Sequence, residues 1–197
     1  MATTLLDAAG LRGVMASFRD ALRSHREALN SLNVYPVPDG DTGSNMTATL
    51  ESVMTELAGV DLEAGIDAVA GAIAHGSLMG ARGNSGVILS QILRGLTSVL
   101  DSAGVVGRIV ADGMAAASTA AYAAVGTPVE GTILTVVREA SEAAVEAADA
   151  GADLLAVIEA AREAGGRSLE RTPELLPVLA EAGVVDAGGY GLSLIHI

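Results

Sequence analysis

One stretch of the chain limits how everything around it can fold: residues 33–46, which read NVYPVPDGDTGSNM. Pro36 and Pro38 fix their own φ angles and push the residues before them toward extended geometry, so this stretch cannot be a helix. Gly40 and Gly43 permit backbone conformations that a Cβ atom would forbid. Because the residues on both sides follow helical patterns, we predict a stiff, shaped loop between two helices, called the acidic loop below.

Two carboxylates stand two residues apart in the acidic loop, at Asp39 and Asp41. In an extended segment, side chains at positions i and i+2 point to the same side, so we expect both carboxylates to converge on one point. Such a pair repels itself unless a cation lies between the two groups, and oxygen ligands favour Mg²⁺ or Ca²⁺. The alternative is an ordinary turn, in which Asp, Gly and Pro are common. The spacing is not that of an EF-hand, since the sixth position counted from Asp39 is Ser44 and the twelfth is Leu50.

The acidic loop leads directly into a predicted helix that reaches about residue 58. Thr42 or Ser44 can cap its first turn. A helix N-terminus beside a bound divalent cation is suited to phosphate. An apolar stripe at helical spacing supports this helix, and its members are Met46, Leu50, Val53, Met54 and Leu57.

Composition limits the class of protein. The chain has 197 residues, which is enough for one domain with a real core, but it holds one Phe, three Tyr and no Trp. Its helices must therefore pack closely through Ala, Leu, Val and Ile. The absence of Cys excludes disulfides and thiolate metal sites. We find neither a membrane-spanning run nor a signal peptide, so we expect a cytoplasmic protein.

The charged residues exclude several chemistries. The chain carries 24 acidic and 11 basic residues, for a net charge of −13, which argues against non-specific binding of nucleic acid. Every base is Arg, and without Lys the chain has neither a P-loop nor a Schiff-base mechanism. A nucleotide bound here would need metal ions and backbone amides to neutralise its phosphates. The arginines of the first helix, Arg12, Arg19, Arg23 and Arg26, are expected on a solvated face and receive no role.

Helical periodicity and helix stop signals predict eight helices and no strand. They cover about residues 7–31, 62–78, 105–125, 128–150, 153–170 and 172–183, with one more from the acidic loop to 58 and one from the segment 80–86 to 100. In an up-and-down bundle of antiparallel helices, alternate loops lie at the same end. The acidic loop, residues 80–86 and residues 127–132 should therefore share one end and form one composite site.

The other loops have two interpretations each. Glycines at 80, 83 and 86 either let backbone N–H groups approach a ligand or form a plain turn capped by Asn84 or Ser85. Residues 127–130, TPVE, predict a capping box, which places Gly131 and Thr132 in the first turn of a helix and leaves room there for a ligand or another helix. Residues 184–191 predict a last glycine-rich turn, in which Asp186 is a cap or binds a sugar hydroxyl. The helix count puts that turn at the opposite end.

These motifs resemble the dihydroxyacetone kinase L-subunit (DhaL-like) family, and within it the N-terminal ATP-binding domain of bacterial fatty acid kinases of the FakA type. The matching segments are residues 33–46, 80–91, 128–136 and 183–192. The resemblance implies an all-α barrel of eight antiparallel helices that holds ATP at one end through two Mg²⁺ ions.

The resemblance also assigns residues. Asp39 and Asp41 match the metal-binding aspartates, through which catalysis would act, and Asn33 is the nearest polar residue where dihydroxyacetone kinases carry a third aspartate. Asn45 matches a phosphate-side asparagine, and Thr42 stands where those kinases carry His. Contacts with the nucleotide are implied for Thr42, Ser44, Asn45, Gly83, Asn84, Ser85, Gly86, Gly131, Thr132, Asp186 and Gly188.

The implied reaction transfers the γ-phosphoryl group of ATP to the carboxylate of a fatty acid. A separate carrier protein of the DegV/FakB type would present that fatty acid and would dock on domains that this chain lacks. The alternatives are a dihydroxyacetone kinase subunit and a regulatory module that binds ATP without turnover, and a homodimer is left open. We expect the domain to cover residues 1–192 and the last five, SLIHI, to be a foreign or truncated tail.

Overall fold

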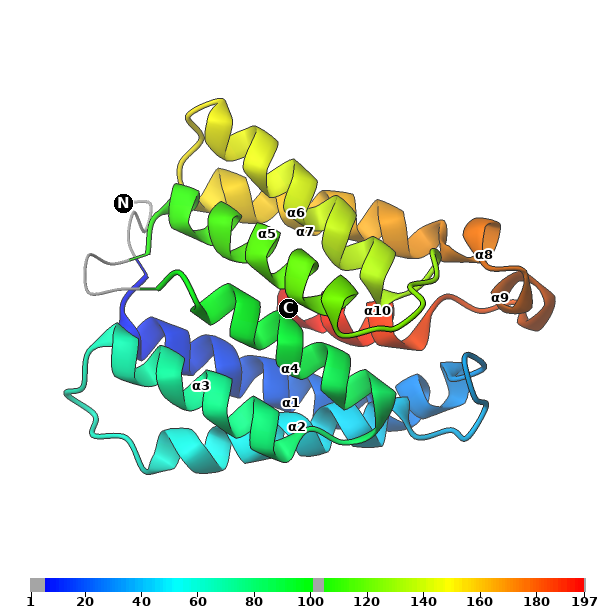
Figure 1. The fold of residues 1–197 in the computed structure, drawn as a ribbon, viewed down its shortest axis with the longest axis horizontal. Coiled ribbons are helices and arrows are strands. Elements are labelled where there is room, and N and C mark those ends of the chain that lie inside the picture. The colour runs from blue at the N-terminus through cyan, green and yellow to red at the C-terminus, as the bar shows by residue number, and fades with distance from the viewer. Residues whose placement is uncertain (1–5, 101–104, 197) are drawn as a thin grey trace.

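The computed structural model describes residues 6–100 and 105–196, and this part of the chain is built from helices without a β-strand (Figure 1). An isolated bridge joins Leu6 to Val105. The all-α prediction is confirmed. The helices are α1 (Ala8–Leu32), α2 (Thr42–Ala58), α3 (Ile66–Gly80), α4 (Gly83–Thr97), α5 (Gly107–Ala123), α6 (Ile133–Asp149), α7 (Leu154–Glu170), α8 (Thr172–Leu175), α9 (Pro177–Ala182) and α10 (Ala187–Ser193), followed by the 3-10 helix η1 (Leu194–His196).

The long helices form a closed ring. Each of α1 to α7 packs against the next, and α10 packs against α1, α6 and α7, which closes the ring (Figure 1). The C-terminal ends of α1, α3, α5 and α7 therefore lie at one end of the barrel, with the N-terminal ends of α2, α4 and α6. The antiparallel up-and-down arrangement is thus confirmed. No helix in the described ranges is long and apolar enough to cross a membrane.

The predicted helix over residues 172–183 is wrong, because the chain breaks there into α8 and α9. Pro177 disfavours a helical backbone at the residue before it, Leu176, which has φ −125° and ψ 101°. Both short helices stay at the end of the barrel where α7 finishes (Figure 1). Only residues 184–186 of the predicted turn at 184–191 lie outside a helix, because α10 begins at Ala187 with Asp186 as its N-cap. Asp186 therefore lies at the same end as the acidic loop, not at the opposite one.

The start of α6 also differs from its prediction. Gly131 has φ +81°, a left-handed conformation that cannot continue into a right-handed helix. The helix begins at Ile133, and Thr132 caps it through a hydrogen bond from Leu134 N to Thr132 Oγ1 of 3.3 Å. Residues 127–132 are a loop, so Pro128 is not the first helical residue and Glu130 takes no part in a capping box.

The core relies on close backbone contact, as the composition predicts. Phe18 is buried together with many aliphatic side chains, and the predicted stripe of α2 is buried except for the half-buried Met54. A Cβ added at Gly43 would overlap the carbonyl oxygen of Arg26, so α1 and α2 touch there through their backbones. Leu194 of η1 is also buried, in the same cluster as helix α1.

Arg12 corrects the view that the arginines of the first helix have no role. Its guanidinium donates to the backbone oxygens of Leu57 (2.9 Å), Val60 (3.3 Å) and Asp61 (2.8 Å). These carbonyls lie at and beyond the end of α2, where backbone acceptors lack partners within the helix. Arg12 thus ends α2 from outside, a contact between positions 45 or more residues apart.

A pair of glycine substitutions tests the contact between α1 and α2. Gly43→Ala should lower the free energy of unfolding by about 2 kcal/mol, because the added methyl group forces two helix backbones apart. Gly13→Ala is the control: nothing lies within 4 Å of its added Cβ, and Ala at this helical position should stabilise the protein by roughly 0.5–1 kcal/mol. Urea denaturation measures both. A Gly43→Ala protein as stable as the wild type would contradict a backbone contact at this position.

Candidate functional site

A pocket of about 160 Å³ opens where α2 and α4 begin. The acidic loop forms one wall, the first turn of α2 another and the first turn of α4 a third. Predicted site residues from both motifs therefore meet in one place. This pocket, called the acidic pocket below, is lined by Asn33, Tyr35, Pro36, Val37, Asp39, Asp41, Thr42, Asn45, Gly83, Asn84 and Ser85.

The acidic loop brings its two carboxylates to this pocket by a turn and not by an extended segment. Gly40 is left-handed at φ +68°, and Asp41 has φ −120° and ψ −1°. The expectation that side chains at i and i+2 align in an extended chain is therefore wrong, although both carboxylates line the pocket. The peptide bond between Tyr35 and Pro36 is cis.

Asn33 positions one of the two carboxylates. Its Nδ2 donates to Asp39 Oδ1 at 2.7 Å, and its side chain is buried. Within the described residues neither Asp39 nor Asp41 has an ion-pair partner, and no basic side chain lines the pocket. The two negative charges are therefore not neutralised by the protein.

The donor set fits a magnesium ion that shares its coordination with a ligand. In the described ranges no three His, Cys, Asp or Glu side chains come together. Mg²⁺ is commonly held by one or two carboxylates and completes its shell with water and substrate phosphates. Asp39 and Asp41 are such a pair.

The N-terminus of α4 faces the same pocket with free backbone donors. No side chain caps this helix, so Asn84 and Ser85 do not form the cap that the plain-turn interpretation required. Within the described residues no protein acceptor is found for the N–H groups of Gly83, Asn84 and Ser85, whereas Gly86 N donates to Arg82 O at 2.9 Å. The amide of Gly86 is thus committed to the helix. A Cβ at Gly83, which has φ +56°, would overlap the side-chain amide of Asn45.

The first turn of α2 is held by α1 and by α4. Neither Thr42 nor Ser44 caps it as predicted. Instead Ser44 N donates to Asn30 Oδ1 and Asn30 Nδ2 donates to Ser44 Oγ, both at 3.1 Å. The hydroxyls of Thr42 and Ser85 lie 3.2 Å apart and join the starts of α2 and α4. The role of Asn30 was not predicted from the sequence. The signal that could have indicated it is its position in the last turn of a helix, directly before a shaped loop.

The remaining predicted residues form a second group between the starts of α6 and α10. Asp186 is only 6% exposed, and its Oδ2 accepts from Gly189 N at 2.7 Å. Gly188 packs beside Ile133, and the N–H of Gly131 donates to Thr135 Oγ1 at 2.8 Å. This group does not line the acidic pocket, although both lie at the same end of the barrel.

A polar network that the sequence did not indicate holds the loop before α6. Glu130 accepts from Tyr122 Oη at 2.9 Å, from Thr135 Oγ1 at 2.8 Å and from Arg138 at 3.0 Å. Burial alone would raise the pKa of Glu130, but these hydrogen bonds outweigh it and lower the pKa from its usual value. The ionised carboxylate thus fixes the loop that ends in Gly131 and Thr132.

The pKa of Asp186 is shifted in the opposite direction to that of Glu130. Burial raises the pKa of its carboxyl group to about 6, against the hydrogen bonds from the backbone of Gly189, Ile133 and Gly188 that lower it. The cap interpretation of this residue is the one that the geometry supports directly, because its carboxylate accepts at the first turn of α10.

Comparisons with known proteins identify a domain family and a similar fold. Residues 36–196 match the DAK2 domain family. The chain is 46% identical over 176 residues to Protein YloV of Bacillus subtilis, and equally to an uncharacterized protein of Staphylococcus saprophyticus, covering 89% of this chain and 32% of each relative. It therefore spans about a third of the length of these relatives. The dihydroxyacetone kinase from C. freundii, solved with AMP-PNP and Mg²⁺, superimposes with a TM-score of 0.63 at 18% identity, over 99% of this chain and 34% of that one. At this identity the match shows the all-α fold alone.

The buried carboxyl of Asp186 predicts a specific pH dependence of stability. Its folded pKa of about 6 lies above the usual 3.8, so its contribution is fully present below pH 3.8 and is lost as pH rises through 6. Asp186→Asn keeps an oxygen acceptor for the N–H of Gly189 and cannot ionise. Relative to this variant, the wild type should lose up to about 3 kcal/mol of unfolding free energy across that window.

Urea denaturation between pH 4 and pH 7 measures this difference. Asp153→Asn, at the exposed N-cap of α7, controls for the loss of a capping carboxylate as such. A constant difference between wild type and Asp186→Asn over the whole range would refute the raised pKa.

Proposed function

Because the chain belongs to the DAK2 domain family, we propose that its acidic pocket binds ATP with magnesium and that the domain serves a kinase. One observation carries the proposal: two carboxylates that have no basic partner among the described residues face the uncapped N-terminus of α4 across a single pocket. Carboxylates attract the cation and free amides attract phosphate, so the two walls together suit a metal–phosphate ligand. The C. freundii structure with AMP-PNP and Mg²⁺ supports this choice by its fold.

Asp39 and Asp41 would hold the magnesium, with two ions expected, and Asn33 would orient Asp39. When bound, the metal neutralises phosphate charge, which is the main requirement of phosphoryl transfer. The N–H groups of Gly83, Asn84 and Ser85 would donate to phosphate oxygens.

Several other residues would take part through their side chains or their position. Asn45 and the hydroxyls of Thr42 and Ser85 supply further donors within the pocket. Gly131, Thr132, Asp186 and Gly188 would contact the nucleoside side of the nucleotide from the same end of the barrel. Ser44 and Gly86 would act by holding the first turns of α2 and α4.

The proposed acceptor is the carboxylate of a fatty acid on a separate carrier protein, giving an acyl phosphate. A carboxylate nucleophile needs no general base, and the pocket lining contains neither His nor Lys. The proposed domain covers residues 1–192. The second candidate is a dihydroxyacetone kinase subunit, favoured by the superposition on that enzyme. A regulatory module that binds ATP without turnover is the third.

Metal-dependent binding is tested with Asp41→Asn. The melting temperature of the wild type should rise with ATP plus Mg²⁺ and hardly with either alone, because a ligand that binds only the folded state stabilises it. Asp41→Asn removes one charge and should weaken nucleotide affinity at least about tenfold, or 1.4 kcal/mol, with an unchanged circular dichroism spectrum. Asp67→Asn, an exposed carboxylate at the start of α3, is the control. Equal thermal shifts in EDTA would contradict metal-dependent binding, and a loss of helix in Asp41→Asn would show that the loop has a structural role instead.

The acceptor is tested by release of ADP. Positioning of donor and acceptor contributes on the order of 7–11 kcal/mol of barrier lowering. We expect residues 1–197 to bind ATP with Mg²⁺ yet to release little ADP, and a full-length relative with its carrier to release ADP only when fatty acid is present. ADP release that follows dihydroxyacetone would favour the second candidate. Binding without turnover by any of these proteins would favour the regulatory module.

A further inference from the structure

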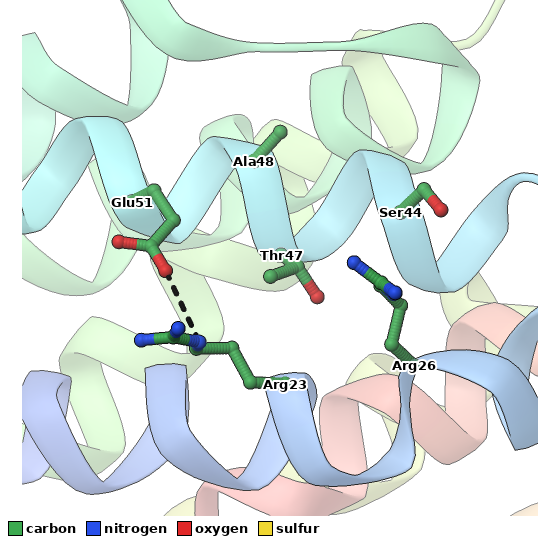
Figure 2. A pocket seen from close by; sticks show the side chains of 6 residues that line it. All are labelled: Arg23, Arg26, Ser44, Thr47, Ala48 and Glu51. Carbon is green, nitrogen blue, oxygen red and sulfur yellow. Dashed lines mark ion pairs between the residues drawn. The ribbon is translucent and has the colours of Figure 1, made fainter.

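A second hollow, of about 390 Å³, lies along the seam between α1 and α2 (Figure 2). Helix α1 contributes Arg23 and Arg26, and α2 contributes a row of mostly polar side chains. It shares no lining residue with the acidic pocket. The residues of this arginine pocket are Arg23, Arg26, Ser44, Thr47, Ala48 and Glu51.

Thr47 has a buried hydroxyl that lacks a partner. Its residue is 8% exposed, and within the described residues its Oγ1 makes no hydrogen bond. The hydroxyls farther along α2 are satisfied within the helix: Thr49 donates to Asn45 O at 2.8 Å and Thr55 donates to Glu51 O at 2.9 Å. Figure 2 shows the Thr47 side chain on the side of α2 that faces α1. A buried polar group without a partner is destabilising, so this hydroxyl is a donor in need of an acceptor.

Two further donors border the same space. Arg26 pairs with its sequence neighbour Glu27 through Nε at 3.0 Å and Nη2 at 2.9 Å, but the Glu27 side chain is 79% exposed and does not line the pocket. Ser44 Oγ accepts from Asn30, which leaves the hydroxyl proton of Ser44 available for donation. Donors thus approach the hollow from both helices.

Glu51 is the carboxylate that lines this pocket. One of its oxygens lies 3.5 Å from Arg23 Nε, and the other lies 4.0 Å from Arg19. Exposed ion pairs of this kind contribute little to stability, so a stronger anion can displace Glu51. Against it stand two guanidinium groups, in a chain whose net charge is −13. The lining thus carries two positive charges and one negative charge, an excess of basic over acidic side chains that the chain as a whole does not have.

We propose that the arginine pocket binds a phosphate group, either as inorganic phosphate or as a small phosphate monoester. A tetrahedral phosphate group presents several oxygens in different directions, which suits donors that arrive from two different helices, and Arg binds such oxygens with paired N–H groups. A carboxylate suits the pocket less well as a ligand, because Glu51 already places one carboxylate there. The site requires no metal ion, in contrast to the acidic pocket. Ser44 lines the arginine pocket and directly precedes Asn45, which lines the acidic pocket. A bound phosphate would therefore also stabilise the helical turn that borders the acidic pocket.

Binding is tested by titrating the protein with inorganic phosphate and with methyl phosphate in EDTA at constant ionic strength. Amide chemical shifts of Ser44 and Thr47 report on the site itself. The matched variants are Arg26→Gln, Thr47→Val and Glu51→Gln, with Arg167→Gln as control, because Arg167 is an exposed arginine on α7. Tighter binding of methyl phosphate would identify a monoester as the ligand, and binding of inorganic phosphate alone would identify the free ion.

The expected pattern is specific. Arg26→Gln should weaken phosphate binding about tenfold or more, since a charged hydrogen bond is lost. Thr47→Val should weaken it several-fold while leaving the unfolding free energy of the ligand-free protein unchanged or raised, because the unpaired hydroxyl is removed. Glu51→Gln should tighten binding and Arg167→Gln should leave it unchanged.

Three results would overturn the proposal: shifts that do not saturate, equal weakening by Arg26→Gln and Arg167→Gln, or wild-type binding by Thr47→Val. None of these bears on ATP binding, because the titration contains no nucleotide or metal.

Discussion

The backbone contact between α1 and α2 is the constraint on which both pockets depend. Gly43 lies against the carbonyl oxygen of Arg26, and Asn30 holds Ser44 through two hydrogen bonds. Both contacts act on the first turn of α2, so they set where this helix begins relative to its neighbour. One side of the turn contributes Asn45 to the acidic pocket, and the other side contributes Ser44 to the arginine pocket. A pocket lined by two aspartates and a pocket lined by two arginines thus open on two sides of a single helical turn.

Local sequence was enough to predict most of the fold, because helix periodicity and helix stops need no knowledge of distant residues. The exceptions lie where a single residue changes whether a segment runs along the barrel or stays at one end of it. Pro177 shortens one predicted helix into two pieces, and this moves Asp186 from one end of the barrel to the other. Likewise, the residues TPVE suit a capping box, but Gly131 packs against Leu176 in a left-handed conformation that only the folded chain reveals.

The candidate site was predictable where the chain itself brings residues together. Asp39 and Asp41 lie two positions apart, and Gly83 to Ser85 are consecutive, so each motif could be recognised alone. Contacts between helices could not be recognised in this way, since they depend on how each helix is rotated about its axis. The hydrogen bonds of Asn30 and Glu130, and the unpaired hydroxyl of Thr47, belong to this class.

The closing of the ring by α10 has a consequence for how the chain reaches its fold. The contacts between α1 and α10 join segments at opposite ends of the sequence, whereas most other neighbours in the ring are consecutive. Such contacts form late, because the intervening chain must first lose much of its freedom. During synthesis, the side of α1 that contacts α10 therefore has no partner from α10 until nearly the whole domain has left the ribosome. This interval is when the nascent domain is most exposed to aggregation or to capture by a chaperone.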